Sequence, residues 1–225
     1  MGFVGFIGTL LKYTVFFSVL VIIALTFYYY FSGSGYLPYG YYQTAKKMYG
    51  DIGVHDISNL TYVLNRAYLP PYKEDVFDST ESSAYLEWYL EGHGFKAYMA
   101  RSDAISHLWV IVELDNGERV AIEPTALTSN KYNPPGIIDA PDGRYRNYSI
   151  TWKEYINKNP GKPYEEFLKQ YSYYYNPPKL FDNPGQIVGI ASTLKYPGWA
   201  KMDISEFDWW NSEPFNSTYP FSEWN

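Results

Sequence analysis

The chain contains no cysteine and has little positive charge for its length. Its 225 residues include 18 lysines and arginines against 24 aspartates and glutamates, which gives a net charge of −6. The lack of cysteine excludes disulfide bonds, cysteine-ligated zinc and a thiol nucleophile in the sequence as written. An acidic chain also lacks the basic surface that a phosphate backbone requires, so we predict that the protein binds no nucleic acid.

Histidine is scarce as well, and the motifs of common cofactor sites are missing. The three histidines, His55, His93 and His107, do not have the spacing of metal ligands. Residues 139–143 lack the positions that a calcium loop needs, and no glycine-rich phosphate motif is present. We therefore predict neither a metal ion nor a cofactor.

An uncharged apolar run at residues 13–31 is the clearest physical signal in the sequence. As a helix, the run would be about 28 Å long, which matches the hydrocarbon core of a bilayer. A cleaved signal peptide is the alternative, with the small residues 32–35 as its cleavage region. The run is longer than the apolar part of a usual signal peptide, so we predict a retained transmembrane helix.

The residues that flank this run indicate its orientation. Lys12 precedes it, and three tyrosines at residues 28–30 form an aromatic belt at its far end. We therefore predict that residues 1–12 are a cytoplasmic tail and that the rest of the chain is extracytoplasmic. Three Asn-X-Ser/Thr sequences agree with an external location, and they begin at Asn59, Asn147 and Asn216.

Beyond the apolar run, the sequence predicts a short stalk followed by one folded unit. Residues 32–41 are rich in Gly, Tyr and Pro and form the stalk, and residues 42–127 form the core. Residues 128–225 are predicted to be an elaboration packed on this core, with an acidic aromatic end. Within that end, Trp209 and Trp210 are expected to pack on the domain, with the bilayer interface as the alternative.

Two helices are predicted before the first strand. One covers residues 58–67, and the other begins after Asp78 or Ser79 and runs to about Glu91. In the second helix only a stripe with Glu87 and Glu91 is polar, so we expect the helix to be mostly buried. Further helical pieces are expected near residues 151–158 and 164–173.

Residues 106–114 and 118–124 are predicted to form a β-hairpin. A two-residue Asn-Gly turn would place unlike side chains opposite each other, whereas a three-residue loop with Gly117 in the left-handed region matches them. The second register pairs Glu113 with Arg119, Val112 with Val120, and Val110 with Ile122.

This register also brings a histidine beside a carboxylate. Trp109 lies opposite Glu123, which leaves His107 diagonal to Glu123 on the same face of the sheet. The Cβ atoms of such a pair are about 7–8 Å apart, within reach of the two side chains. We therefore predict that a hydrogen bond between His107 and Glu123 can form.

The order of these features resembles a known family. "DSTES" (residues 78–82) opens the buried helix, and "HLWVIVELDNGERVAIEPT" (residues 107–125) follows. Together they resemble the transglutaminase-like domain of the papain-like cysteine protease superfamily, over about residues 58–127. The resemblance implies an α+β fold in which a buried nucleophile helix packs on an antiparallel sheet, here preceded by the transmembrane helix.

The resemblance also implies a site. His107 stands at the position of the family's catalytic histidine, and Glu123 stands where the acid is usually Asp. Ser79 stands at the position of the nucleophilic cysteine, although on its own it could simply cap the helix. Trp109 and Glu81 match further motif positions, and the backbone N–H of Ser79 or Thr80 could help to bind an oxyanion.

The serine at position 79 leaves three functions open. A cysteine at a helix N-terminus beside an imidazolium ionises near neutral pH, whereas a serine hydroxyl does not. The first and favoured function is an inactive domain that binds peptides or cell-envelope components at the cell surface. The second is a hydrolase or acyltransferase acting on amides or esters, with His107 as general base and Glu123 as its orienting partner. The third is a native cysteine enzyme that carries a Cys to Ser change at position 79.

Overall fold

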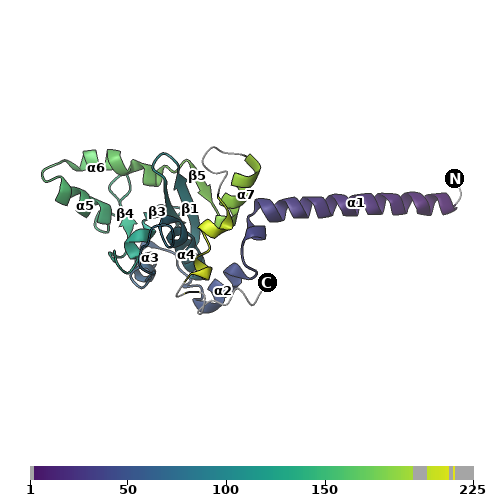
Figure 1. Ribbon diagram of the computed structural model, residues 1–225, viewed down its shortest axis with the longest axis horizontal. Coiled ribbons are helices and arrows are strands. Elements are labelled where there is room, and N and C mark those ends of the chain that lie inside the picture. The colour runs from purple at the N-terminus through teal and green to yellow at the C-terminus, as the bar shows by residue number, and fades with distance from the viewer. Residues whose placement is uncertain (1–2, 195–201, 213–214, 216–225) are drawn as a thin grey trace.

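A long apolar helix projects from a mixed helix and sheet domain (Figure 1). The structure is a computed structural model, and it describes residues 3–194, 202–212 and 215. The N-terminal helix α1 spans Phe3–Phe31. Within it, Leu10–Phe31 is long and apolar enough to cross a membrane, and none of this stretch is buried inside the protein. The apolar helix therefore begins earlier in the chain than the predicted span and ends at the same residue.

Three hydroxyl side chains on α1 are satisfied within the helix. Each donates to the carbonyl oxygen four residues earlier, at 3.0 Å for Thr14, 2.9 Å for Ser18 and 2.9 Å for Thr26. A polar group without a partner is costly in a hydrocarbon environment, and these local bonds remove that cost. These three hydroxyl residues of α1 are thus compatible with a membrane span.

The sheet of the domain contains five antiparallel strands in the order β4-β3-β2-β1-β5 within the described residues. The predicted register of the central hairpin is confirmed, because Val110 pairs with Ile122 and Glu113 pairs with Arg119. Gly117 has a φ of 80°, as the three-residue loop requires. The strands are β1 (Lys96–Ser102), β2 (His107–Glu113), β3 (Arg119–Ile122), β4 (Ile137–Ile138) and β5 (Lys179–Phe181).

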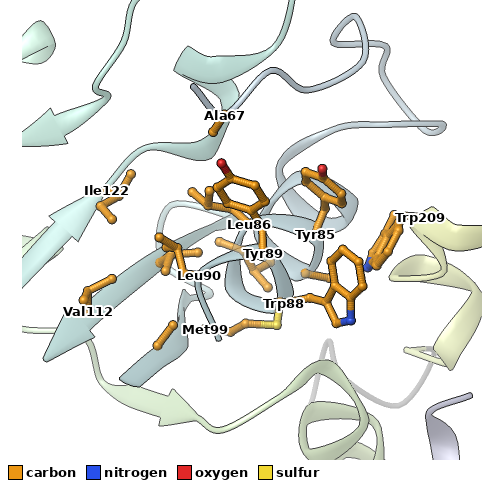
Figure 2. Close-up of a cluster of buried hydrophobic side chains, with 14 of the residues drawn as sticks. Ala67, Tyr85, Leu86, Trp88, Tyr89, Leu90, Met99, Val112, Ile122 and Trp209 are labelled. Atoms are coloured by element: carbon orange, nitrogen blue, oxygen red, sulfur yellow. The ribbon is translucent and has the colours of Figure 1, made fainter. Parts of the chain in front are cut away.

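Helix α4 (Ser79–Gly92) covers one face of this sheet. Figure 2 shows Leu86 and Leu90 of α4 gathered with Val112 and Ile122 of the sheet in one buried cluster. The prediction that this helix is mostly buried is confirmed. The expected polar stripe is wrong in one respect, because Glu87 is fully buried.

Aromatic side chains cover the opposite face of the sheet. Trp109 and Ile111 of β2 pack there against Tyr174, which belongs to the 3-10 helix η3 (Ser172–Tyr175). Before η3, the chain forms α5 (Ile150–Lys158) and α6 (Tyr164–Tyr171), close to the predicted helical pieces. In Figure 1 these two helices lie at the end of the domain remote from α1. Helix α3 (Ile57–Leu64) precedes the sheet in the chain, and the 3-10 helix η2 (Pro124–Leu127) lies between β3 and β4.

The predicted stalk is packed against the domain. Gly33 approaches α7 (Pro184–Leu194) so closely that a Cβ atom on Gly185 would lie 2.1 Å from the Gly33 carbonyl oxygen. The side chain of Asn183 also donates to the carbonyl oxygen of Ser32 at 2.9 Å. Two glycines with no side chain allow this contact, which fixes the end of α1 on the domain. The elements beside it are η1 (Ser34–Tyr36) and α2 (Tyr41–Met48).

Trp209 and Trp210 pack on the domain, as predicted. Trp209 is fully buried, its ring lies 4.8 Å from that of Trp88, and its Nε1 donates to the hydroxyl of Tyr41 at 2.9 Å. Trp210 is also buried. They belong to η5 (Trp209–Asn211), which follows η4 (Ile204–Glu206). Glu213, Glu223 and the Asn-X-Thr sequence at Asn216 lie outside the described residues.

Candidate functional site

A histidine and a glutamate meet where the central hairpin ends. His107 is the first residue of β2, and Glu123 directly follows β3. Nε2 of His107 lies 2.8 Å from Oε2 of Glu123. The hydrogen bond predicted from the register is therefore present.

Glu123 accepts hydrogen bonds at both of its oxygens. Besides His107, the Tyr174 hydroxyl donates to Oε2 at 2.8 Å. The Thr125 hydroxyl donates to Oε1 at 2.7 Å, and the Thr125 backbone N–H lies 3.3 Å from the same oxygen. Only 8% of Glu123 is exposed, and these donors replace the water that the carboxylate loses on burial.

The electrostatic balance favours an ion pair at this site. Burial raises the pKa of Glu123, but hydrogen bonds and the charge of His107 outweigh burial and leave the pKa lowered. Burial lowers the pKa of His107, but the hydrogen bond and charge of Glu123, together with the charge of Asp78, leave it raised. At pH values between these two pKa values, a carboxylate beside an imidazolium is therefore the favoured state.

Trp109 supports the imidazole from within the protein. Its ring is nearly parallel to that of His107, with centroids 6.0 Å apart and planes inclined by 19°. Its Nε1 donates to the backbone carbonyl of Tyr174 at 3.1 Å. Trp109 is fully buried and therefore has no exposed surface that could contact a ligand. It can influence a ligand only through His107.

Ser79 lies in the first turn of α4, near this pair. Asp78 precedes it as the N-cap residue, so the alternative in which Ser79 caps the helix is wrong. Ser79 is half-buried, and its hydroxyl makes no hydrogen bond among the described residues, His107 and Glu123 included. The charge of Asp78 raises the pKa of His107, which places the start of α4 within electrostatic range of the imidazole. The structure thus joins two of the three predicted catalytic residues by a hydrogen bond and does not join the third to them.

The other two predicted binding residues serve the cap of α4. The backbone N–H of Thr80, one of the two predicted oxyanion donors, donates instead to Oδ1 of Asp78 at 2.7 Å. The backbone N–H of Ser79, the other predicted donor, has no acceptor within the described part of the chain. Glu81 accepts from the backbone N–H of Asp78 at 2.9 Å and completes a capping box, and burial raises its pKa to about 7.

Sequence reasoning missed three residues around the pair. Thr125 could have been found, because a Thr two residues after a strand-ending carboxylate is a common local hydrogen-bonding pattern. Tyr174 gives no local signal, since it lies 51 residues from Glu123. Tyr72 lies in the loop before α4, and burial and then the charges of Asp78, Glu74, Glu123 and Asp75 raise its pKa.

No group of three or more His, Asp or Glu side chains among the described residues could hold a metal ion. What the site offers instead is a pair of hydrogen-bond donors. Nδ1 of His107 has no hydrogen-bond partner among the described residues, and the same holds for the N–H of Ser79. Both groups suit an oxygen acceptor such as a carbonyl or a carboxylate.

The fold and the site define an α+β domain with a buried His–Glu pair, attached to one apolar helix that is able to span a membrane. An uncharacterized protein of Methanocaldococcus jannaschii is 32% identical to this chain over 181 residues. The match covers 77% of this chain, and the chain spans 65% of the relative's length. No protein family and no solved structure matches the chain. The description of this relative assigns no activity that could be carried to the site.

Proposed function

We propose that the protein is a membrane-anchored, extracytoplasmic domain with a transglutaminase-like core that binds peptides or cell-envelope components without catalysing acyl transfer. The apolar helix α1 supports the anchor, by its length and composition. The helix start at Ser79, the His107 strand and the Glu123 strand occur in the order expected for such a core. The structure alone shows an α+β domain, and the assignment of a transglutaminase-like core comes from the sequence resemblance.

The observation that carries the proposal is the state of the His–Glu pair. Burial lowers the pKa of His107, but the hydrogen bond at 2.8 Å and the charge of Glu123 raise it and favour the imidazolium, and no hydrogen bond joins the imidazole to the Ser79 hydroxyl. A protonated imidazole cannot take a proton from serine, so it is a poor general base. It is a strong hydrogen-bond donor to an acceptor oxygen, which is what a binding site requires.

The test is a binding measurement with the full chain in lipid nanodiscs. The probes are an array of tetrapeptides, each with a free carboxylate or a carboxamide at its end. We expect His107→Gln to weaken binding at least tenfold, because a charged hydrogen bond to the ligand is lost. Ser79→Ala should bind as the parent protein does, because the donor at this residue is its backbone N–H.

His55→Gln is the matched control, since His55 pairs with Asp51 and Asp115 and belongs to a different part of the molecule. Its binding should equal that of the parent protein. Equal binding by His107→Gln and the parent protein would contradict the proposed site.

One observation favours a second function, hydrolysis or acyl transfer by Ser79. Nδ1 of His107 and the N–H of Ser79 are both unoccupied by described residues, as a general base and an oxyanion donor would be. A fluorophosphonate probe distinguishes the two functions. Labelling that rises with pH and disappears in both Ser79→Ala and His107→Ala would establish the second function. A blank result between pH 6 and pH 9 would remove it.

A further inference from the structure

Tyr174 brings a hydroxyl to the site from a distant part of the chain. It donates to Oε2 of Glu123 at 2.8 Å, and Nε2 of His107 bonds to the same oxygen at 2.8 Å. We propose that Tyr174 is a positioning residue for His107, which it restrains and tunes through the carboxylate of Glu123. The proposal rests on the proposed function in one respect, because that function makes His107 the group that meets the ligand.

Tyr174 is itself held in place by the residue beneath the imidazole. It is buried, and its backbone carbonyl accepts the Nε1 hydrogen bond of Trp109 at 3.1 Å. Its ring packs edge-on against two neighbours, with centroids 5.3 Å from Trp109 and 6.2 Å from His107. The hydroxyl therefore has a fixed direction towards Glu123, and the ring limits the rotation of the imidazole.

The two oxygens of Glu123 are used by different partners. Oε1 accepts from Thr125, whereas Oε2 is shared by His107 and Tyr174. The carboxylate cannot exchange its oxygens without breaking bonds on both sides. Replacing Tyr174 therefore alters the hydrogen bonding of Oε2, which contacts the imidazole. Replacing Thr125 alters the hydrogen bonding of Oε1.

Other titratable groups near the site are the same in the parent protein and in a Tyr174 variant. Asp78, the N-cap of α4, adds to the charge of Glu123 in raising the pKa of His107. Tyr72, in the loop before α4, has a pKa raised by burial and then by the charges of Asp78, Glu74, Glu123 and Asp75. Neither Asp78 nor Tyr72 shares a hydrogen bond with Tyr174, but the side chain of Tyr173 does, and Tyr173 also interacts with the charge of Glu123. Tyr173→Phe in the same titration separates its contribution from that of the Tyr174 hydroxyl.

A donor to Oε2 disperses the negative charge that stabilises the imidazolium. Tyr174→Phe keeps the ring and removes this donor, so the carboxylate should attract the imidazolium more strongly. We expect the pKa of His107 to rise by about half a unit or more. The measurement is an NMR titration of ¹³C-labelled histidine in the full chain in nanodiscs. With three histidines in the chain, His55→Gln and His93→Gln suffice to assign the signals.

Tyr175→Phe is the matched control from the same segment. Its hydroxyl accepts from the backbone N–H of Ala121 at 3.1 Å and donates to the carbonyl of Ile138, and it does not touch Glu123. This control should lower stability and leave the pKa of His107 unchanged. Thr125→Val should shift the pKa of His107 less than Tyr174→Phe does, because Thr125 bonds to the other oxygen.

A double mutant tests whether the effect passes through the carboxylate. In a Glu123→Gln background, Tyr174→Phe should leave the pKa of His107 unchanged, because the mediating charge is gone. An unchanged or lowered pKa in Tyr174→Phe alone would overturn the proposal, and so would an equal shift in Tyr175→Phe. The titration needs no ligand, so a failure of peptide binding would contradict the proposed function and leave this inference intact.

Discussion

Two of the buried carboxyl groups in this domain, those of Glu123 and Glu87, have pKa values shifted in opposite directions. Glu123 is 8% exposed and accepts hydrogen bonds from His107, Tyr174 and Thr125. Glu87 is 0% exposed and accepts one, from the Tyr42 hydroxyl at 2.7 Å. Its Oε2 has no hydrogen-bond partner among the described residues. The pKa of Glu123 is lowered, whereas burial and then the charge of Glu91 raise the pKa of Glu87 well above its ordinary value.

The comparison teaches that burial alone does not decide the charge of a carboxyl group. Removal from water disfavours the ionised form in both places, and the number and charge of the donors decide the outcome. Glu123 has a cationic partner and serves as an anion that holds His107. Glu87 has a single neutral donor and serves as an uncharged hydrogen-bonding group between α4 and Tyr42 of α2.

The hydrogen bonds of Tyr42 agree with an uncharged Glu87. The Tyr42 hydroxyl lies 2.7 Å from Oε1 of Glu87 and 3.2 Å from the carbonyl oxygen of Asp182. A hydroxyl has one proton and cannot donate fully to both acceptors. If Glu87 is protonated, its own proton can be donated to Tyr42, and the Tyr42 proton is then free for Asp182.

The two glutamates therefore give stability opposite dependences on pH. Because the pKa of Glu123 is lowered in the folded state, its contribution is present above its unfolded pKa and is lost as pH falls through the folded pKa. Because the pKa of Glu87 is raised, its contribution is present below its unfolded pKa and is lost as pH rises through the folded pKa.

The largest expected effect comes from Glu123→Ala. The change leaves the imidazole of His107 without its partner, and breaking a buried ion pair costs about 3 kcal/mol of unfolding free energy. The pKa of His107 should fall, because burial then acts without the opposing hydrogen bond and charge. Urea unfolding followed by tryptophan fluorescence and a histidine NMR titration measure the two effects. A loss below about 1 kcal/mol would show that the pair behaves like one at the surface.

A smaller effect is expected from Tyr42→Phe. This change removes the hydroxyl that is hydrogen-bonded to Glu87 and should lower the free energy of unfolding by about 1 kcal/mol. Tyr68→Phe is the control, because Tyr68 is 64% exposed and its change should fall within about 0.5 kcal/mol. Equal losses in the two variants would contradict a special role for the Tyr42–Glu87 contact.

The site was predictable where its geometry depends on neighbouring strands. The charge pair Glu113 and Arg119 selects one hairpin register, and that register alone brings His107 to Glu123. The start of α4 was also predictable to within a residue, because cap residues act locally. Short-range backbone rules are sufficient for both features.

The surroundings of the site were not predictable, because they depend on contacts between distant segments. The hydroxyl of Tyr174 reaches Glu123 through the packing of η3 on the sheet, and no local pattern marks one tyrosine among 26. Glu87 has helical spacing with Glu91 and therefore looked solvated, yet α2 covers it. Residues 32–41 were predicted to be a stalk, whereas Gly33 packs closely on Gly185 of the domain.

The smallest effect, and the sharpest test of the comparison, is expected from Glu87→Gln. A glutamine has nearly the shape of a protonated glutamic acid, so at pH 5 the two proteins should differ in unfolding free energy by less than about 0.5 kcal/mol. As pH rises, the parent protein must either keep a proton on Glu87 or bury a charge, whereas the glutamine cannot ionise. The variant should therefore become progressively more stable than the parent protein at alkaline pH.

Glu123→Gln is the matched control, with the same change at the second of the two carboxyls compared. It should destabilise the protein most at neutral pH, where Glu123 is ionised and holds His107, and the difference should shrink as acid protonates the parent carboxylate. Urea unfolding at intervals from pH 4 to pH 9 measures both variants. Parallel pH profiles for Glu87→Gln and Glu123→Gln would mean that the two carboxyls share one protonation state. Diverging profiles would establish that the hydrogen-bond donors around each carboxyl group, both of them buried, keep Glu123 charged and Glu87 neutral.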